Sequence, residues 1–246
     1  MANRELPFVS VILAVKNGAK FLRESLESVL RQSHAPLEII VLDDQSIDET
    51  RAIVENFDSP KIRYICNDPQ LGIAGSRNHG IQLAKGELLA FTSHDDIWLP
   101  EKLSRQYECF ARDPALDVCL SHVRCFVDPN ETVPPQSFPK DLIGKDVPGW
   151  VIETLVARRS AFERAGFFDE SFAQADDTEW YARAQRMGLS ILMLPEALVR
   201  KRLHGQSVTY GRDRAKTGRR ELLEIARRSI AQQRSSDPPA PQKEKS

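Results

Sequence analysis

The sequence has few cysteines and no long hydrophobic run. Its 246 residues include four cysteines, at positions 66, 109, 119 and 125, and none of them belongs to a CxxC pair. This scarcity argues against a disulfide-rich fold and fits a reducing compartment, so we expect a cytoplasmic protein. No apolar run approaches the ~18 residues of a membrane-spanning helix, and residues 1–7 lack the apolar region of a signal peptide.

Several motifs for catalysis and nucleotide binding are also absent. No GxGxxG follows the first predicted strand and no GxxxxGKS or GxxxxGKT occurs, which argues against dinucleotide-binding and P-loop proteins. There is no GxSxG nucleophile elbow, no HExxH helix and no zinc-type spacing. The chain is 41% hydrophobic and 28% charged, which is the composition of a globular protein with a sizeable core.

A formal net charge of −1 conceals a basic segment near the C-terminus. Residues 200–234 carry 11 basic and 3 acidic side chains, whereas residues 1–199 carry a net charge of −9. We expect a basic helix within 206–234 and a disordered tail over 235–246, which holds three prolines. The basic helix is either a solvated surface helix or a peripheral contact with an anionic membrane, and we expect no nucleic acid as a partner.

Short apolar runs alternate with helix-period segments over the first hundred residues. Runs typical of buried strands cover residues 9–15, 37–42, 62–65 and 88–91. Apolar residues recur at helical spacing over residues 21–30, 48–57, 74–84 and 100–113. This order predicts an α/β fold with a mostly parallel central sheet and helices on both faces. Such sheets bind ligands beyond the carboxyl ends of their strands.

The second half of the chain is less regular. After a predicted strand over 118–127, five prolines in residues 128–149 predict a long irregular loop. The remaining predicted elements are a strand over 150–158, helices over 160–166 and 176–187, short strands over 190–194 and 197–202, and a helix over 222–230. Gly188 is the expected C-terminal cap of the second of these helices.

Three pairs of adjacent aspartates carry the chemistry that the sequence suggests. Asp95-Asp96 follows a predicted strand, where carboxylates can bind a divalent cation and through it a diphosphate; the alternative is helix capping. Asp43-Asp44 ends another strand, and Asp43 can instead form an Asx-turn with Ser46. Asp176-Asp177 opens a helix and offers either a general base or a cap.

Together with the segments around them, these pairs resemble a known family. Six blocks carry the resemblance in order: 9–17, 32–50, 71–87, 94–96, 167–177 and 202–204. The chain resembles the inverting nucleotide-sugar glycosyltransferases of GT-A fold, family-2 type, from about residue 8 to residue 207. The resemblance implies one GT-A domain over 1–205, with a nucleotide-binding half over about 1–100 and an acceptor-binding half over about 101–205.

The resemblance also implies residues for the donor side of a site. Asp44 would hold the nucleoside near the main chain of Ala14, within the turn that contains Asn17. Arg77 would contact the nucleotide or its diphosphate, and Asp95 would orient the sugar nucleotide. The donor would be a UDP-, GDP- or dTDP-linked sugar.

The remaining roles concern metal, catalysis and acceptor. Asp96 would coordinate Mn²⁺ or Mg²⁺, and His204 would touch the metal or the diphosphate. Asp177 would be the base that deprotonates an acceptor hydroxyl in a glycan, a lipid-linked sugar or another molecule. Asp176 and Trp150 are candidates for the acceptor side, although core packing is an equal alternative for Trp150.

The sequence departs from the family pattern in a few places. Lys16 stands where an aromatic residue is common, Ser93 where Asp is common, and Asp176 where Glu is usual. We expect Trp98 to be a core residue. Two other functions stay open. A sugar-phosphate nucleotidyltransferase would carry a glycine-rich loop near the first strand, and residues 14–19 contain one glycine. A non-catalytic binding module would be expected to have lost Asp96 or Asp177.

Overall fold

A computed structural model describes residues 7–34, 36–130, 138–205, 217–218 and 220–229. The amino-terminal half forms the predicted parallel sheet, since its apolar runs are buried on both faces. Its strands are β1 (Val9–Val15), β2 (Leu37–Asp43), β3 (Ile62–Cys66) and β4 (Leu88–Thr92). The helices between them are α1 (Leu22–Leu30), α2 (Thr50–Glu55) and α3 (Gly72–Leu83).

The second half extends the same sheet with mixed pairing. Its strands are β5 (Ile97–Trp98), β6 (Val118–Val127), β7 (Asp146–Pro148), β8 (Val156–Arg158) and β9 (Ile191–Leu203). The strand order is β3-β2-β1-β4-β8-β6-β9-β5, with β7 beside β6. Strand β8 pairs antiparallel with β4 and with β6, and so it joins the two halves into one sheet.

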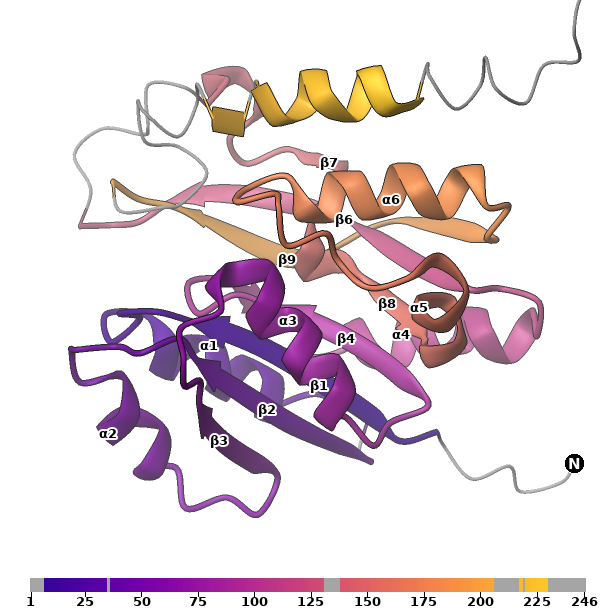
Figure 1. Cartoon of the computed structure of the whole chain (residues 1–246). Helices are drawn as coiled ribbons and strands as arrows, with labels where there is room; N and C mark the ends of the chain where they lie inside the picture. The colour runs from indigo at the N-terminus through magenta and orange to yellow at the C-terminus, as the bar shows by residue number, and fades with distance from the viewer. Residues whose placement is uncertain (1–6, 35, 131–137, 206–216, 219, 230–246) are drawn as a thin grey trace, which may run out of the picture.

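Helices cover both faces of the sheet (Figure 1). Helices α1 and α4 (Lys102–Arg112) bury side chains in one hydrophobic core, and α3, α5 (Arg159–Ala165) and α6 (Asp176–Arg186) bury side chains in the other. Trp98 is 2% exposed in the first core, which confirms its predicted role. Gly188 follows α6 with a φ of 72°, as expected for a terminating glycine.

Three local predictions were wrong. Residues 150–158 form a 3₁₀ turn, η2 (Ile152–Thr154), before the short β8, because the Thr154 hydroxyl donates to the carbonyl oxygens of Gly149 and Val151 and stabilises a turn. Within the predicted loop 128–149, the described residues form a second 3₁₀ turn, η1 (Lys140–Leu142), and β7. The two predicted short strands after α6 are one strand, β9, whose irregular register against β6 absorbs Pro195.

A helix after the sheet covers residues 217–218 and 220–229 and is called the C-terminal helix below. It lies over α6 at the top of Figure 1. Residues 206–216, 230–234 and the predicted disordered tail 235–246 lie outside the described residues. No helix in the described part of the chain is long and apolar enough to span a membrane.

Candidate active site

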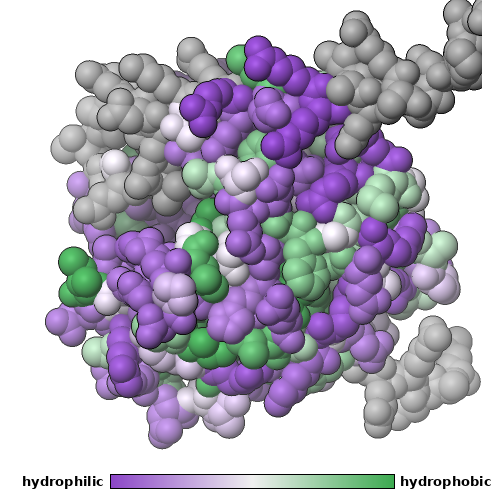
Figure 2. Space-filling model, in the orientation of Figure 1, coloured by the Kyte–Doolittle hydropathy of each residue, from purple (hydrophilic) through white to green (hydrophobic). Residues whose placement is uncertain are grey.

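A cavity of about 540 Å³ opens where the carboxyl ends of β1 and β4 face α3 and α6. In Figure 2, hydrophobic residues are visible on a largely hydrophilic surface, between the amino-terminal half and the C-terminal helix. Charged side chains of both signs line the cavity: Arg77, Asp95, Glu153, Glu170, Asp176, Asp177 and Lys201. Of the predicted donor residues, Ala14, Arg77 and Asp95 line it.

Arg77 and Asp176 link the two halves at this cavity. The Arg77 side chain on α3 donates to Asp176 Oδ2 at the start of α6, over 2.5 Å. Both side chains are largely buried, at 11% and 2% exposure. Arg77 therefore places positive charge in the cavity wall, and Asp176 is occupied in holding it there.

Asp177 lies in the cavity wall, held by backbone hydrogen bonds. Its Oδ2 accepts a hydrogen bond from the Ile152 backbone N–H at 3.1 Å, and its Oδ1 accepts one from the Thr178 N–H at 2.6 Å. Desolvation in the cavity wall and the neighbouring Asp176 raise the pKa of Asp177 to about 6, against the opposing charge of Arg77. Such a carboxylate is ionised at pH 7 yet basic enough to take a proton from a hydroxyl in a transition state.

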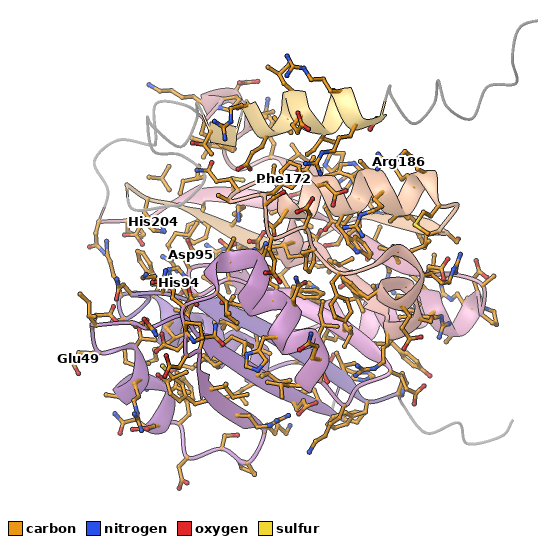
Figure 3. All side chains as sticks on the ribbon, in the orientation of Figure 1. Glu49, His94, Asp95, Phe172, Arg186 and His204 are labelled. Atoms are coloured by element: carbon orange, nitrogen blue, oxygen red, sulfur yellow. The ribbon has the colours of Figure 1, made fainter. Side chains whose placement is uncertain are left out.

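Asp95 forms a pair with His204. The imidazole Nε2 donates to Asp95 Oδ2 over 3.0 Å, and His204 is 3% exposed. Figure 3 shows His204, Asp95 and His94 close together at the junction of the two halves. Although burial opposes ionisation, the hydrogen bond from His204 and nearby positive charges hold the pKa of Asp95 well below its usual range. Asp95 thus presents an ionised carboxylate to the cavity.

Asp96 points into a buried ion-pair network instead of lining the cavity. It is fully buried, and it accepts hydrogen bonds from Lys201 Nζ at 3.0 Å and from the Arg202 N–H at 2.8 Å. Lys201 Nζ also lies 3.1 Å from Glu153 Oε2. Burial raises the pKa of Asp96, and the Lys201 ammonium opposes that rise. The predicted metal role of Asp96 stays a prediction, since the carboxylate is engaged in this conformation.

The predicted divalent cation has two candidate protein ligands beside the cavity, Asp95 and His204. Among the described residues, no group of three or more His, Cys, Asp and Glu side chains could hold a metal ion. Asp95 and His204 are nevertheless adjacent and of suitable chemistry, and Nδ1 of His204 is buried without a hydrogen-bond partner in the described structure. Two protein donors fit a cation that takes its other ligands from phosphate and water, as Mg²⁺ usually does.

Asp44 and Asn17 take part in loop structure beside the cavity. Asp44 is 5% exposed and accepts hydrogen bonds from the N–H groups of Leu71 and Gly72 at 2.7 and 3.0 Å, which fixes the start of α3. Asn17 Oδ1 accepts from the Ile47 N–H at 2.9 Å. Their predicted roles in nucleotide binding stay predictions. Asp43 also holds this loop, since its Oδ1 accepts from the Ser46 N–H at 2.8 Å; the bond reaches three residues on, one more than the Asx-turn considered for Asp43.

Sequence reasoning missed three charged residues of the cavity, Glu153, Glu170 and Lys201, and left one aromatic residue undecided. Glu153 is 3% exposed and accepts a hydrogen bond from the Ser93 hydroxyl at 2.5 Å. A lone carboxylate in the apolar stretch 150–158 was a signal for it, whereas nothing near Lys201 set it apart from its basic neighbours. Trp150 is 43% exposed at the cavity and packs its ring edge-on to Tyr181, with centroids 5.6 Å apart.

Comparison with known proteins places the chain in a family. The model of glycosyl transferase family 2 matches residues 10–172, so the chain belongs to this family. It is 30% identical over 222 residues to an uncharacterized glycosyltransferase of Rickettsia typhi, across 84% of this chain and 67% of that protein. A 98-residue segment is 39% identical to UDP-Glc:α-D-GlcNAc-diphosphoundecaprenol β-1,3-glucosyltransferase WfgD of Escherichia coli, covering 40% of this chain and 39% of WfgD.

Solved structures agree on the fold. The mannosyltransferase PcManGT of Pyrobaculum calidifontis, in complex with GDP-Man and Mn²⁺, matches with a TM-score of 0.71 at 21% identity, over 97% of this chain and 67% of that one. TarS of S. aureus, in complex with UDP-GlcNAc, matches with a TM-score of 0.66 at 22% identity, over 81% and 60%. The fold is the predicted GT-A fold. The chain spans about two thirds of the length of the first curated relatives it matches.

Proposed function

We propose that this protein is a metal-dependent, inverting glycosyltransferase that moves a sugar from a nucleotide-sugar donor to an acceptor hydroxyl in glycan or glycoconjugate biosynthesis. One observation carries the proposal. An ionisable carboxylate, Asp177, whose burial raises its pKa to about 6, lines the same cavity as the Arg77 guanidinium and the Asp95 carboxylate. A base for the acceptor and a cation for the leaving group thus face one space.

The donor side of the cavity lies against the amino-terminal half. We assign the sugar nucleotide to the region of Ala14, Arg77 and Asp95, where the guanidinium can meet the charge that develops on a departing diphosphate. Asp95 and His204 would hold the Mn²⁺ or Mg²⁺ ion, which when bound would neutralise the same diphosphate charge. UDP- and GDP-linked sugars are the first donors to test, because WfgD is named for UDP-Glc, and TarS and PcManGT form complexes with UDP-GlcNAc and GDP-Man.

The acceptor side lies toward the second half. An acceptor hydroxyl is a poor nucleophile until its proton is accepted, and Asp177 is the group that accepts it. The oxygen then attacks the anomeric carbon as the bond to the diphosphate breaks, and this single displacement inverts the configuration. The exposed face of Trp150 offers an apolar surface to the C–H face of an acceptor sugar.

The acceptor and the location are parts of the same proposal. A glycan or a lipid-linked sugar fits a cavity that combines carboxylates with an aromatic wall. For a lipid-linked acceptor we place the protein in the cytoplasm, at the inner face of a membrane, with the exposed Arg220 and Arg227 of the C-terminal helix toward anionic headgroups. Failure to bind anionic vesicles at low salt would remove the membrane contact from the proposal.

Thermal melting with UDP, GDP, dTDP and CDP, each with and without Mn²⁺, tests the donor site. A ligand at 100 times its dissociation constant stabilises the folded state by about 2.7 kcal/mol, which for a chain of this length raises the melting temperature on the order of 5–10 °C. We expect one nucleotide to give this rise when Mn²⁺ is present. No rise with any nucleotide would contradict the proposal and favour a non-catalytic module that no longer binds nucleotides.

A further inference from the structure

The carboxylate of Glu221 binds the backbone just ahead of α6. Its Oε1 accepts a hydrogen bond from the Ala173 N–H at 2.9 Å, and its Oε2 accepts from the N–H groups of Gln174 and Ala175 at 3.0 and 2.9 Å. Glu221 is 7% exposed, so water cannot readily replace it. Ala175 is the residue at the N-terminal end of α6, and its side chain has no oxygen that could cap that end.

The C-terminal helix is docked onto α6 and the segment before it by several further contacts. Ile225 packs against Phe172 and Ala175 in a small hydrophobic cluster. Arg228 donates to Asp169 at 2.9 Å, with its guanidinium 5.0 Å from the centre of the Phe172 ring. At the far end of α6, Arg186 donates to the Ser229 hydroxyl at 2.8 Å. Figure 3 shows Phe172 beneath the helix and Arg186 close to it.

These contacts surround the residues that carry the site. Asp176 and Asp177 come directly after the three amides that Glu221 binds, and Leu222, the next residue of the C-terminal helix, lines the cavity itself. The Glu221 carboxylate also lies at the N-terminal end of α6, where the first turn already holds Asp176, Asp177 and Glu179. A negative charge is favourable at a helix N-terminus, and here one comes from another helix.

We propose that Glu221 is a positioning residue of the active site, and that the C-terminal helix is therefore a functional part of the catalytic domain, although it lies outside residues 10–172, which the family model matches. The assignment rests on the proposed role of Asp177 as the base. By fixing three consecutive amides, Glu221 sets where α6 begins. That start determines how the Asp177 carboxylate faces the cavity.

Three variants test this role. Glu221→Ala removes both acceptor oxygens, Glu221→Gln keeps one of them, and Glu163→Gln removes an exposed carboxylate of α5 as a matched control. For each variant, three quantities are measured: the affinity for UDP and GDP in Mn²⁺, the rate of nucleoside diphosphate release from UDP-glucose and GDP-mannose, and amide hydrogen exchange over residues 173–178.

We expect Glu221→Ala to slow donor turnover about 100-fold, the size of effect that a small misplacement of a catalytic group produces. Nucleotide affinity should stay within about twofold, because Arg77 and Asp95 belong to other elements, and exchange over residues 173–178 should rise about tenfold or more. Glu221→Gln should recover part of both losses, and Glu163→Gln should match the wild-type protein.

Two results would overturn the assignment. One is a Glu221→Ala variant with the turnover and exchange of the control, and the other is a parallel loss of nucleotide affinity and turnover, which shows a general packing role. Failure of the proposed function looks different, because the wild-type protein would then release no nucleoside diphosphate from either donor. The exchange measurement would in that case still show whether Glu221 orders residues 173–178.

Discussion

Arg77 of α3 and Asp176 of α6 form an ion pair in the wall of the candidate active-site cavity, with a nitrogen–oxygen distance of 2.5 Å. The pair ties the helix that follows β3 to the helix that carries the proposed base. Because Asp176 is 2% exposed, its charge has no access to bulk water and depends on Arg77.

Removing Arg77 should destabilise the fold as well as the site. We expect Arg77→Met to lower the free energy of unfolding by about 3–5 kcal/mol, because it leaves the Asp176 carboxylate buried and uncompensated. Urea unfolding followed by circular dichroism measures the change. The double variant Arg77→Met with Asp176→Leu should recover most of the loss, and no recovery would show that the pair does not account for it.

Replacing the proposed base should separate binding from chemistry. Asp177→Asn keeps the size of the side chain and an acceptor oxygen for the Ile152 N–H, so nucleotide binding should survive. Transfer should fall by about 10²–10⁴-fold, the usual contribution of a general base. Nucleotide titration and product formation are compared with Asp141→Asn, an exposed control. An active Asp177→Asn enzyme would assign the base elsewhere, with Glu153 as the next carboxylate to test.

The pH dependence of transfer should show the raised pKa of Asp177. Desolvation and the adjacent Asp176 raise this pKa to about 6, and the base works only when ionised. We therefore expect kcat/KM to be level above pH 7 and to fall about tenfold per pH unit below pH 6. The profile is measured with saturating Mn²⁺ between pH 5 and 8. A profile that stays level down to pH 5 would contradict the desolvated environment described for Asp177.

Metal binding should depend on Asp95 more than on Asp96. Asp95 lines the cavity beside His204, whereas Asp96 is engaged by Lys201 and the Arg202 backbone. We expect Asp95→Asn and His204→Ala to abolish the part of the nucleotide-induced melting shift that requires Mn²⁺. Asp96→Asn should keep that part while lowering the melting temperature of the free protein. The reverse pattern would mean that Asp96 leaves Lys201 to bind the cation, as the sequence predicted.

A buried lysine outside the site should make stability depend on pH. Lys102 is fully buried, with its ammonium 4.0 Å from the centre of the Trp98 ring and 2.8 Å from Gln106 Oε1. Burial lowers its pKa to about 7 from 10.5, so above pH 7 the unfolded chain holds a proton that the folded protein has lost. The free energy of unfolding therefore increases as the pH rises above 7, and it decreases as the pH falls toward 7, where burying the charged ammonium destabilises the folded protein.

Lys102→Met removes that titration. Relative to the variant, the wild-type protein should gain stability between pH 7.0 and pH 8.5, as measured by urea unfolding at the two values. The lost hydrogen bond to Gln106 affects the variant equally at both pH values and so does not mimic the effect. A stability difference that stays constant with pH would show that Lys102 is ionised in the folded protein.

The sequence predicted the amino-terminal half well because its signals are local. Strands that are buried on both faces need continuous apolar runs, and residues 9–15 and 37–42 carry them with helical periods between. Where turn chemistry competes with strand propensity, as at Thr154, the prediction was wrong. The two-residue strand β5 was missed because its pairing with β9 joins residues about a hundred positions apart.

The sequence alone determined the GT-A fold and the family, since six blocks of residues resemble the family in the same order, and the family model matches residues 10–172. It brought Ala14, Arg77, Asp95, Asp176, Asp177 and Trp150 into consideration, and these residues do line one cavity. Only the tertiary structure showed that Asp95 lines that cavity and Asp96 does not, and that both Asp176 and Asp177 line it. Side-chain direction depends on distant partners, such as Lys201 for Asp96 and Arg77 for Asp176, and no spacing within the chain encodes them.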